Sequence, residues 1–306
     1  MATGKIPCGI AIPQTSAPVD VRFLRDYLSR AEALGYDSVW VQEQILGDTP
    51  MLEPITLLTY AAALTSKMRL GTSVILPITR NPVHLAKAVS TLDQLSQGRV
   101  TLGVGIGNPH VPEPAFGISK ENRSRRFVEG LRVMKALWTQ PRATFAGEFW
   151  KFENVAMEPK PLQKPHPPIW FGARDEVALK RTVRHGDGWM GAGSSSTTDF
   201  LKQSAMLRRL LEEAKRDPAK FPISKRVYLA IDDNRERGER RLREWFGERY
   251  KNADMAPRVS IWGGVAECVD KLGELVRAGA QHFLLNPVFD EMQHLEQLAS
   301  DLIPRL

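Results

Sequence analysis

The sequence predicts a closed barrel of eight parallel β-strands alternating with α-helices, the (β/α)8 or TIM-barrel architecture of the α/β class. Eight short apolar segments alternate with segments of helical periodicity along 306 residues, which lies in the size range of one such barrel. No Pro-, Gly- or Ser-rich linker divides the chain, and no repeat of about 20–50 residues is visible in it. We therefore expect a single domain over residues 1–306.

The clearest strand–helix–strand unit lies in the first half of the chain. Residues 70–76 are apolar and β-branched, as in a strand covered on both faces. Residues 81–95 begin with an Asn-Pro helix start and carry apolar residues at helical spacing. A second strand at 100–104 then runs into Gly105 and Gly107. The unit is a βαβ crossover whose second strand ends in bare backbone that a ligand can approach.

The rest of the chain supplies six more strands and the helices between them. The other predicted strands are residues 9–12, 38–41, 169–172, 188–191, 226–231 and 282–285. The other predicted helices are residues 19–34, 55–64, 126–138, 176–185, 197–215, 235–250, 266–278 and 291–302. Insertions after the fourth strand are a loop at 108–122, a hairpin at 144–152 turning at Ala146-Gly147, and a Pro-rich connector at 158–168.

A doubly wound open sheet is the alternative fold. That fold requires a Gly-rich fingerprint directly after the first strand. Ile12-Pro13-Gln14 stand at this position. The barrel is therefore the favoured prediction.

The formal net charge of +7 favours an anionic ligand through long-range attraction. The basic residues are spread through helical segments such as 235–243, where they alternate with Glu. Such segments are typical of solvated helix faces. Nucleic-acid binding is therefore not expected.

Cysteine usage and apolar runs indicate the compartment. Cys8 and Cys268 lie far apart with no metal-like spacing, which favours buried thiols in a reducing, cytoplasmic setting. The N-terminal apolar run is too short for a signal peptide, and no run approaches the ~18 apolar residues of a membrane span. We expect a protein that is neither exported nor membrane-bound.

In such a barrel the functional site lies at the carboxyl ends of the strands. The residues at these positions include no Ser-His-Asp set, no cluster of metal ligands and no pair of carboxylates, whereas glycines, amides and hydroxyls are plentiful. This composition favours a bulky cofactor that brings its own chemistry, and no metal is expected. A barrel aldolase or isomerase is the alternative, but it needs a Lys or a carboxylate at an inner strand end, and Glu43 stands nearly alone there.

Two segments lead from predicted strands into helix N-termini: Gly172-Ala173-Arg174, and Gly193-Ser194-Ser195-Ser196, which follows Gly191 at the end of its strand. Free N–H groups and the helix dipole favour phosphate at such places, and the two strands are neighbours in the predicted barrel. The alternative is that the serines are an ordinary N-cap cluster.

Several motifs occur together in one order along the chain: LGTSV, RNPVHLAKAVSTLDQLSQGRVTLGVGIGN, RFVEGLRVMKALW, PKPLQKPHPPIWFGA and GDGWMGAGSS. In this combination the chain resembles the luciferase-like monooxygenase family from about residue 9 to residue 285. The resemblance implies the same eightfold barrel, usually as a homodimer. It also implies a flavin-type oxidoreductase that uses FMN or the deazaflavin coenzyme F420.

The resemblance also implies cofactor contacts. Thr72-Ser73-Val74 is similar to a strand-three motif of the F420 branch, in which the Ser–Val peptide is cis and presses on the middle ring of the cofactor; otherwise this segment is a plain strand. By the same comparison Gly105-Ile106-Gly107 lines the ring. The two segments at 172–174 and 193–195 hold the phosphate.

The chain departs from the family's sugar-phosphate dehydrogenases at the acid–base positions. Glu43-Gln44 stand where those enzymes have Asp-His, and Asn108 stands where they have Glu. Since amides do not exchange protons near neutral pH, sugar-phosphate activity is not expected. Glu43, Gln44 and Asn108 remain the candidate catalytic residues, with Glu43 as an acid or base or as a group that orients a neighbour. His110 is an outside candidate.

The expected function is hydride transfer between F420 or FMN and a small organic substrate. An FMN-dependent monooxygenase that uses O2 is one alternative. A flavin-binding protein without turnover is the alternative from another class.

Overall fold

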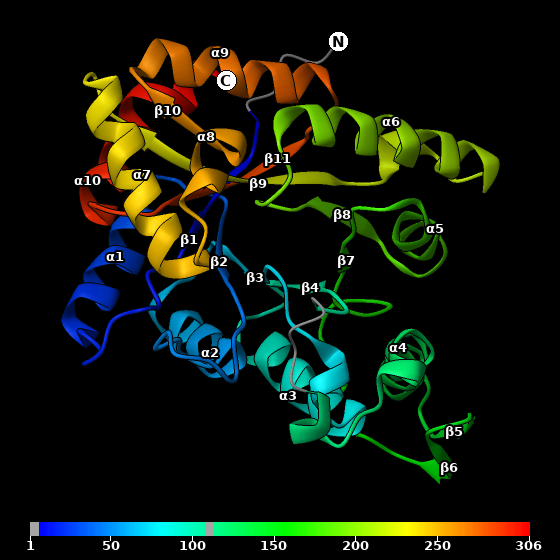
Figure 1. Cartoon of the computed structure of the whole chain (residues 1–306). Helices are drawn as coiled ribbons and strands as arrows, with labels where there is room; N and C mark the ends of the chain where they lie inside the picture. The colour runs from blue at the N-terminus through cyan, green and yellow to red at the C-terminus, as the bar shows by residue number, and fades with distance from the viewer. Residues whose placement is uncertain (1–5, 108–112) are drawn as a thin grey trace. The chain divides into compact units, whose positions relative to one another are not determined.

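The structure is a computed structural model, which describes residues 6–107 and 113–306 (Figure 1). Its strands are β1 (Cys8–Ala11), β2 (Ser38–Val41), β3 (Arg69–Thr72), β4 (Val100–Val104), β5 (Ala143–Ala146), β6 (Lys151–Val155), β7 (Ile169–Gly172), β8 (Gly188–Gly191), β9 (Ile223–Ile231), β10 (Ser260–Gly263) and β11 (His282–Pro287). Its α-helices are α1 (Val21–Ala33), α2 (Pro54–Leu64), α3 (Pro82–Leu95), α4 (Arg123–Thr139), α5 (Glu176–His185), α6 (Thr197–Glu213), α7 (Arg235–Tyr250), α8 (Ala256–Val259), α9 (Val265–Arg277) and α10 (Glu291–Gln297).

One sheet runs in the order β10-β9-β11-β1-β2-β3-β4-β7-β8, and β8 also pairs with β9. This additional pairing closes eight parallel strands into a barrel, and β10 extends the sheet from β9. The predicted (β/α)8 architecture is therefore confirmed. The register at β1 places Ile10 beside Val39 on one side and beside Leu285 on the other.

By its internal packing the chain divides into two compact units. The terminal unit comprises Met1–Trp40 and Phe171–Leu306, and the central unit comprises Val41–Trp170. The single domain expected over residues 1–306 stays a prediction.

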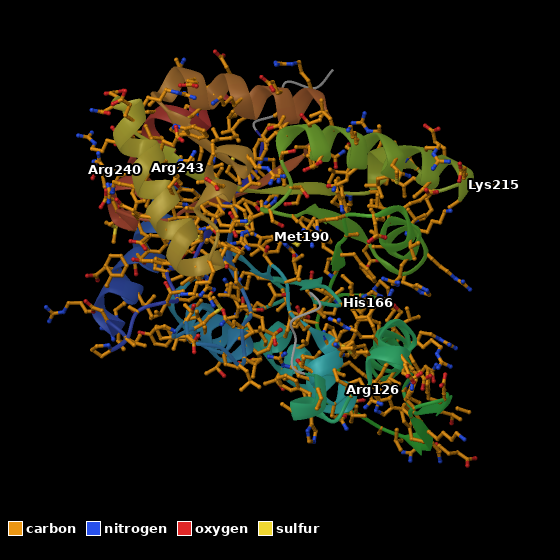
Figure 2. All side chains as sticks on the ribbon, in the orientation of Figure 1. Arg126, His166, Met190, Lys215, Arg240 and Arg243 are labelled. Carbon is orange, nitrogen blue, oxygen red and sulfur yellow. The ribbon has the colours of Figure 1, made fainter. Side chains whose placement is uncertain are left out.

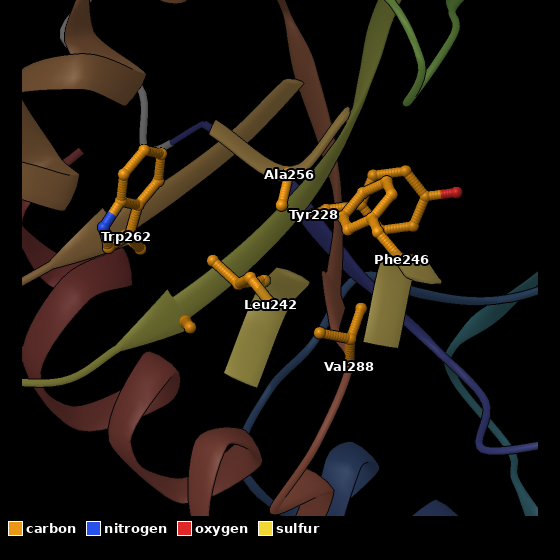
Figure 3. Packing of buried hydrophobic residues seen from close by; sticks show 7 residues of the cluster. Tyr228, Leu242, Phe246, Ala256, Trp262 and Val288 are labelled. Atoms are coloured by element: carbon orange, nitrogen blue, oxygen red, sulfur yellow. The ribbon is translucent and has the colours of Figure 1, made fainter. Parts of the chain in front are cut away.

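The core of the terminal unit is built around β9 and α7 (Figure 3). Leu242 and Phe246 are one helical turn apart on α7, so both reach the same buried face. The ring of Phe246 meets the ring of Tyr228 edge-on, with the centroids 5.1 Å apart. Trp262 from β10 and Val288 after β11 complete the cluster.

The other face of α7 carries the basic residues. Arg243 pairs with Glu239 at 2.8 Å and Arg240 approaches Glu244 at 4.0 Å (Figure 2). Both pairs join residues four apart on the exposed side of the helix. This confirms the interpretation of segment 235–243 as a solvated face.

In the central unit the β5–β6 hairpin is attached to α4. The Glu129 carboxylate of α4 accepts hydrogen bonds from the N–H groups of Glu148, Phe149 and Trp150. The Arg126 guanidinium, also on α4, lies over the Trp150 ring at 4.7 Å (Figure 2). The turn therefore spans residues 147–150 rather than two residues at 146–147, because the carboxylate organises the backbone there.

Three other elements differ from the prediction. The strand expected at 70–76 ends at Thr72, and the chain pairs again only at Ile75, which bridges to Val104. β9 begins at Ile223, three residues before the predicted start, because its polar residues 224–226 interrupt the apolar pattern. β10 was not predicted.

Cys8 and Cys268 are free thiols, and both are buried as expected. Burial raises the pKa of Cys268 to about 12, so this thiol is not a ready nucleophile. Within residues 6–107 and 113–306, no helix combines the length and apolar character that crossing a bilayer requires.

Candidate functional site

The segment that follows β3 packs tightly against the end of β4. The peptide bond between Ser73 and Val74 is cis, as the resemblance implies. A Cβ atom on Gly105 would lie 2.7 Å from Cγ2 of Val74, so only glycine fits at this position. The Thr72 hydroxyl is buried and donates a 2.7 Å hydrogen bond to the Gly103 carbonyl, which anchors β3 to β4.

Ile106 and Gly107, the residues after Gly105, are also predicted to contact the cofactor ring. The carbonyl of Ile106 accepts a 2.8 Å hydrogen bond from the Arg123 guanidinium. Gly107 has φ +85°, in the left-handed region that glycine adopts without strain. The candidate Asn108 and the alternative His110 lie outside the described residues.

Glu43, on the segment after β2, is held by partners on both carboxylate oxygens. The Leu76 N–H donates to one oxygen at 2.5 Å, and the Arg80 guanidinium bonds the other. Arg80 also pairs at 2.9 Å with Glu53, the N-cap of α2. The Glu43 side chain is 1% exposed, and burial raises its pKa although Arg80 opposes this shift. Glu43 therefore connects the segment after β2 to the loop after β3.

Gln44 turns its side chain over the following loop. Gly47 has φ +145°, and a Cβ atom there would lie only 1.8 Å from Nε2 of Gln44. The amide thus lies beside Gly47, whose positive φ favours glycine at that position.

In the terminal unit, the two predicted phosphate-binding segments lie together. Arg174, just after β7, donates a 3.2 Å hydrogen bond from Nη1 to the hydroxyl of Ser194, which follows β8. The indole N–H of Trp189 on β8 donates a 3.0 Å bond to the carbonyl of Ala173. α5 and α6, which begin after these segments, pack against each other (Figure 1). The adjacency predicted from strand order is therefore present.

Glycines allow this loop to lie close to aromatic rings. A Cβ atom on Gly191 would lie 2.7 Å from the Phe200 ring, and one on Gly193 would lie 2.7 Å from the Tyr228 ring. A side chain at either position would displace the backbone. The loop therefore exposes main-chain groups rather than side chains at these two positions.

The N-terminus of α6 is already capped. The Asp199 carboxylate accepts from the N–H and the hydroxyl of Ser196, and the Ser196 hydroxyl accepts from the Asp199 N–H. The ordinary N-cap interpretation is thus correct for Ser196. Ser195 donates its N–H to Ala192 at 3.1 Å. An anion near this helix would therefore meet the loop that precedes the first turn.

Two side chains that the sequence analysis did not select contribute to the candidate site. Arg80 binds Glu43, and Lys225 binds the loop after β8. Lys225 on β9 is 3% exposed, and its ammonium donates to the carbonyls of Ala192 and Ser195. A sequence signal existed for Lys225, since it and Arg226 are two adjacent basic residues directly before the run of residues 227–231. Arg80 had no such signal, because its partner Glu43 is 37 residues away.

Comparison with known proteins identifies the family. The family described as luciferase-like monooxygenase matches residues 6–282. An uncharacterised protein of Mycobacterium tuberculosis is 43% identical over 140 residues, which are 45% of this chain and 49% of that protein, so the match spans about half of this relative's length. The F420-dependent glucose-6-phosphate dehydrogenase of Kineococcus radiotolerans is 28% identical over 317 residues, 92% of each chain.

Two solved structures share the fold. An F420-dependent secondary alcohol dehydrogenase in complex with an F420-acetone adduct has a TM-score of 0.85 at 21% identity over 99% of both chains. The oxygenating constituent of 3,6-diketocamphane monooxygenase from Pseudomonas putida, in complex with FMN, has a TM-score of 0.80 at 17% identity over 99% of both chains. The order of motifs, the closed barrel and the family match agree: the chain belongs to the luciferase-like monooxygenase family.

Proposed function

We propose that this protein is an F420-dependent oxidoreductase that transfers a hydride between the cofactor and a small organic substrate, with FMN as the alternative cofactor. The observation that carries the proposal is the hydrogen bond between Arg174 and Ser194. This bond joins the loop after β7 to the loop after β8 and brings a guanidinium next to a hydroxyl. The F420-dependent relative at 28% identity over 92% of the chain favours F420 over FMN.

The phosphate of the cofactor is assigned to the loop around Gly193. Its ligands are the N–H groups of Gly193 and Ser194 together with the Arg174 guanidinium, which is suited to two parallel bonds with phosphate oxygens. Because the first turn of α6 is capped by Asp199, the phosphate lies before the helix rather than on its first turn. F420 and FMN both carry a phosphate on the chain attached to the ring system, so the assignment holds for either.

The ring of the cofactor is assigned to Ser73–Val74 and to Gly105–Gly107. Val74 and Gly105 approach so closely that this surface has no room for another side chain, which suits a flat aromatic ligand. Such a cofactor, when bound, accepts or delivers a hydride at its central ring. The residues of the chain supply shape, orientation and exclusion of water.

Glu43 is assigned an orienting role. Both of its carboxylate oxygens have partners, Leu76 and Arg80, so neither is directed at a substrate in the described geometry. Gln44 and Asn108 replace proton-exchanging residues, which supports substrates other than sugar phosphates. The catalytic roles of Glu43, Gln44 and Asn108 stay predictions.

Titration of the purified protein with F420 and with FMN tests the cofactor. Ser194→Asp and Arg174→Met should each weaken binding at least about tenfold, because a carboxylate repels phosphate and a lost guanidinium leaves it unpaired. Arg209→Met is the matched control, since Arg209 is an exposed arginine paired with Glu176 and Glu213. If neither F420 nor FMN binds tightly, the proposal is overturned.

Turnover separates the enzyme from the alternatives. Reduced cofactor in the protein should be reoxidised by alcohol-derived ketones, enones or aldehydes faster than free cofactor. Faster reoxidation by O2 with bound FMN would instead indicate a monooxygenase. Binding without acceleration by any acceptor would indicate a binding protein.

We further propose that the protein is a cytoplasmic homodimer, as the family resemblance and the two buried free thiols support. Sedimentation equilibrium tests the dimer. A concentration-independent monomer mass would exclude it.

A further inference from the structure

Lys225 is a buried cation whose partners are carbonyl groups. Its ammonium donates to Ala192, and to Ser195 at 2.9 Å, while the ring of Phe200 lies 5.9 Å from Nζ. In residues 6–107 and 113–306 it has no carboxylate partner, and its third N–H has no acceptor there. Burying a lysine without an opposite charge is costly. A ligand that brings negative charge to this place would reduce that cost.

The charged groups around Lys225 leave the loop positive. From α6, the only acidic side chain that acts on it among the described residues is Asp199, whose carboxylate is already bonded to Ser196. On β9 itself, the neighbouring Arg226 directs its guanidinium to Asn286. From the loop after β7, Arg174 reaches Ser194. Two cations thus bracket the loop, while the carboxylates of Asp175 and Asp199 serve the N-terminal caps of α5 and α6.

We propose that Lys225 is a positioning residue for the phosphate of the bound ligand. It holds the Ala192 carbonyl, so that the Gly193 N–H, which points the opposite way in the same trans peptide, faces the phosphate, and it fixes the end of the loop at the Ser195 carbonyl. The phosphate, on the far side of the Ala192–Gly193 peptide, favours the charged form of the buried ammonium. Gly191 supports this arrangement, because a Cβ atom there would lie 3.1 Å from Cδ of Lys225. The inference rests on the proposed cofactor-binding function.

Proton uptake follows from this arrangement. Burial lowers the pKa of Lys225 to about 7, with Arg226 adding to the shift and Asp199 opposing it. At pH 8 the amine is then mostly neutral in the ligand-free protein. A phosphate bound at the Gly193 N–H, across one peptide unit from Nζ, favours the charged form, so Nζ takes up a proton from solvent as the ligand binds.

Calorimetry on the wild-type protein measures this proton. The ligand is whichever of F420 and FMN binds, and the comparison ligand is the same ring system without phosphate, which is riboflavin for FMN. At pH 8, titrations in two buffers of different ionisation enthalpy should show uptake of about half to one proton per phosphorylated ligand. The phosphate of FMN contributes none, because its second pKa is near 6. The phosphate-free ligand should show no uptake.

Substitution isolates the positioning role. Lys225→Met should weaken binding of the phosphorylated ligand about 10- to 100-fold and abolish proton uptake, while the affinity for the phosphate-free ring stays the same. Lys225→Arg, which keeps the charge, should restore part of the affinity without proton uptake at pH 8. Lys202→Met is the matched control, because Lys202 is an exposed lysine on α6.

The outcomes separate the two proposals. If the wild-type protein binds neither cofactor, the proposed function fails. If it prefers the phosphorylated ligand but takes up no proton, or if Lys225→Met weakens both ligands equally, the function stands and the role of Lys225 is overturned. Should Lys225→Met fail to fold, the wild-type calorimetry alone decides.

Discussion

Glu43 and Lys225 are two buried ionisable side chains next to segments assigned to the cofactor, and they differ in their partners. Glu43, in the central unit, has a guanidinium and a backbone N–H on its carboxylate. Lys225, in the terminal unit, has two carbonyls and no carboxylate among the described residues. Burial shifts the pKa of each toward the neutral form: upward for Glu43 and downward for Lys225.

The difference indicates two uses of a buried charge. In a pair such as Glu43 and Arg80, each charge already has its partner within the protein. The two charges therefore stabilise a loop and are not available to a ligand. A cation held only by carbonyl dipoles lacks a partner of opposite charge, so its charge favours the binding of an anion nearby. Burial alone therefore does not identify a ligand site, whereas burial combined with the kind of partner does.

The largest expected effect is the loss of the partner of Glu43. Arg80→Met should lower the free energy of unfolding by about 3–5 kcal/mol, because it leaves a buried carboxylate without its cation. Urea denaturation at pH 7.5 measures the change. The double variant Glu43→Gln, Arg80→Met should recover much of the loss. If Arg80→Met costs less than about 1 kcal/mol, Glu43 is not a charged member of a buried pair.

The second effect is the pH dependence of the ligand-free protein. The folded-state pKa of Lys225, about 7, lies below the value of an unfolded lysine, so between these values the unfolded chain binds more protons and stability rises with pH. From pH 7 to 10, wild type should gain about 2–4 kcal/mol relative to Lys225→Met. Parallel stability curves for the two proteins would contradict the lowered pKa.

The sequence predicts most of the fold and the part of the site that depends on strand order. Apolar periodicity located the strands of the barrel, and the barrel order placed Arg174 near Ser194. The cis bond at Ser73–Val74 came from the family resemblance. The pairing of Glu43 with Arg80 and the carbonyl contacts of Lys225 did not follow, because local periodicity reports which residues are buried and not which distant groups meet.

The third effect concerns close packing of the backbone. Gly105→Ala should destabilise the protein by about 1–3 kcal/mol and weaken cofactor binding, because the new methyl group would overlap the Val74 side chain. Gly247→Ala is the control: it lies within α7, where a Cβ atom would meet only the Ala253 side chain at 3.8 Å. It should stabilise by about 0.5–1 kcal/mol and leave binding unchanged. Equal effects of the two changes would indicate that Gly105 is not a packing constraint.

The smallest effect extends the comparison to a buried histidine. His294 on α10 accepts a 3.1 Å hydrogen bond at Nε2 from the N–H of Ile231, which requires the neutral ring. Burial lowers its pKa from the usual value near 6.5, although Asp290 opposes this shift. The unfolded chain therefore binds the proton first, and stability should fall by about 1 kcal/mol as the pH drops from 7.5 to 5.5. His294→Gln, which removes the titrating ring, should reduce that slope in chemical denaturation at the two pH values. An unchanged slope would show that other groups carry the acid sensitivity and that a buried group already satisfied by the backbone contributes little to it.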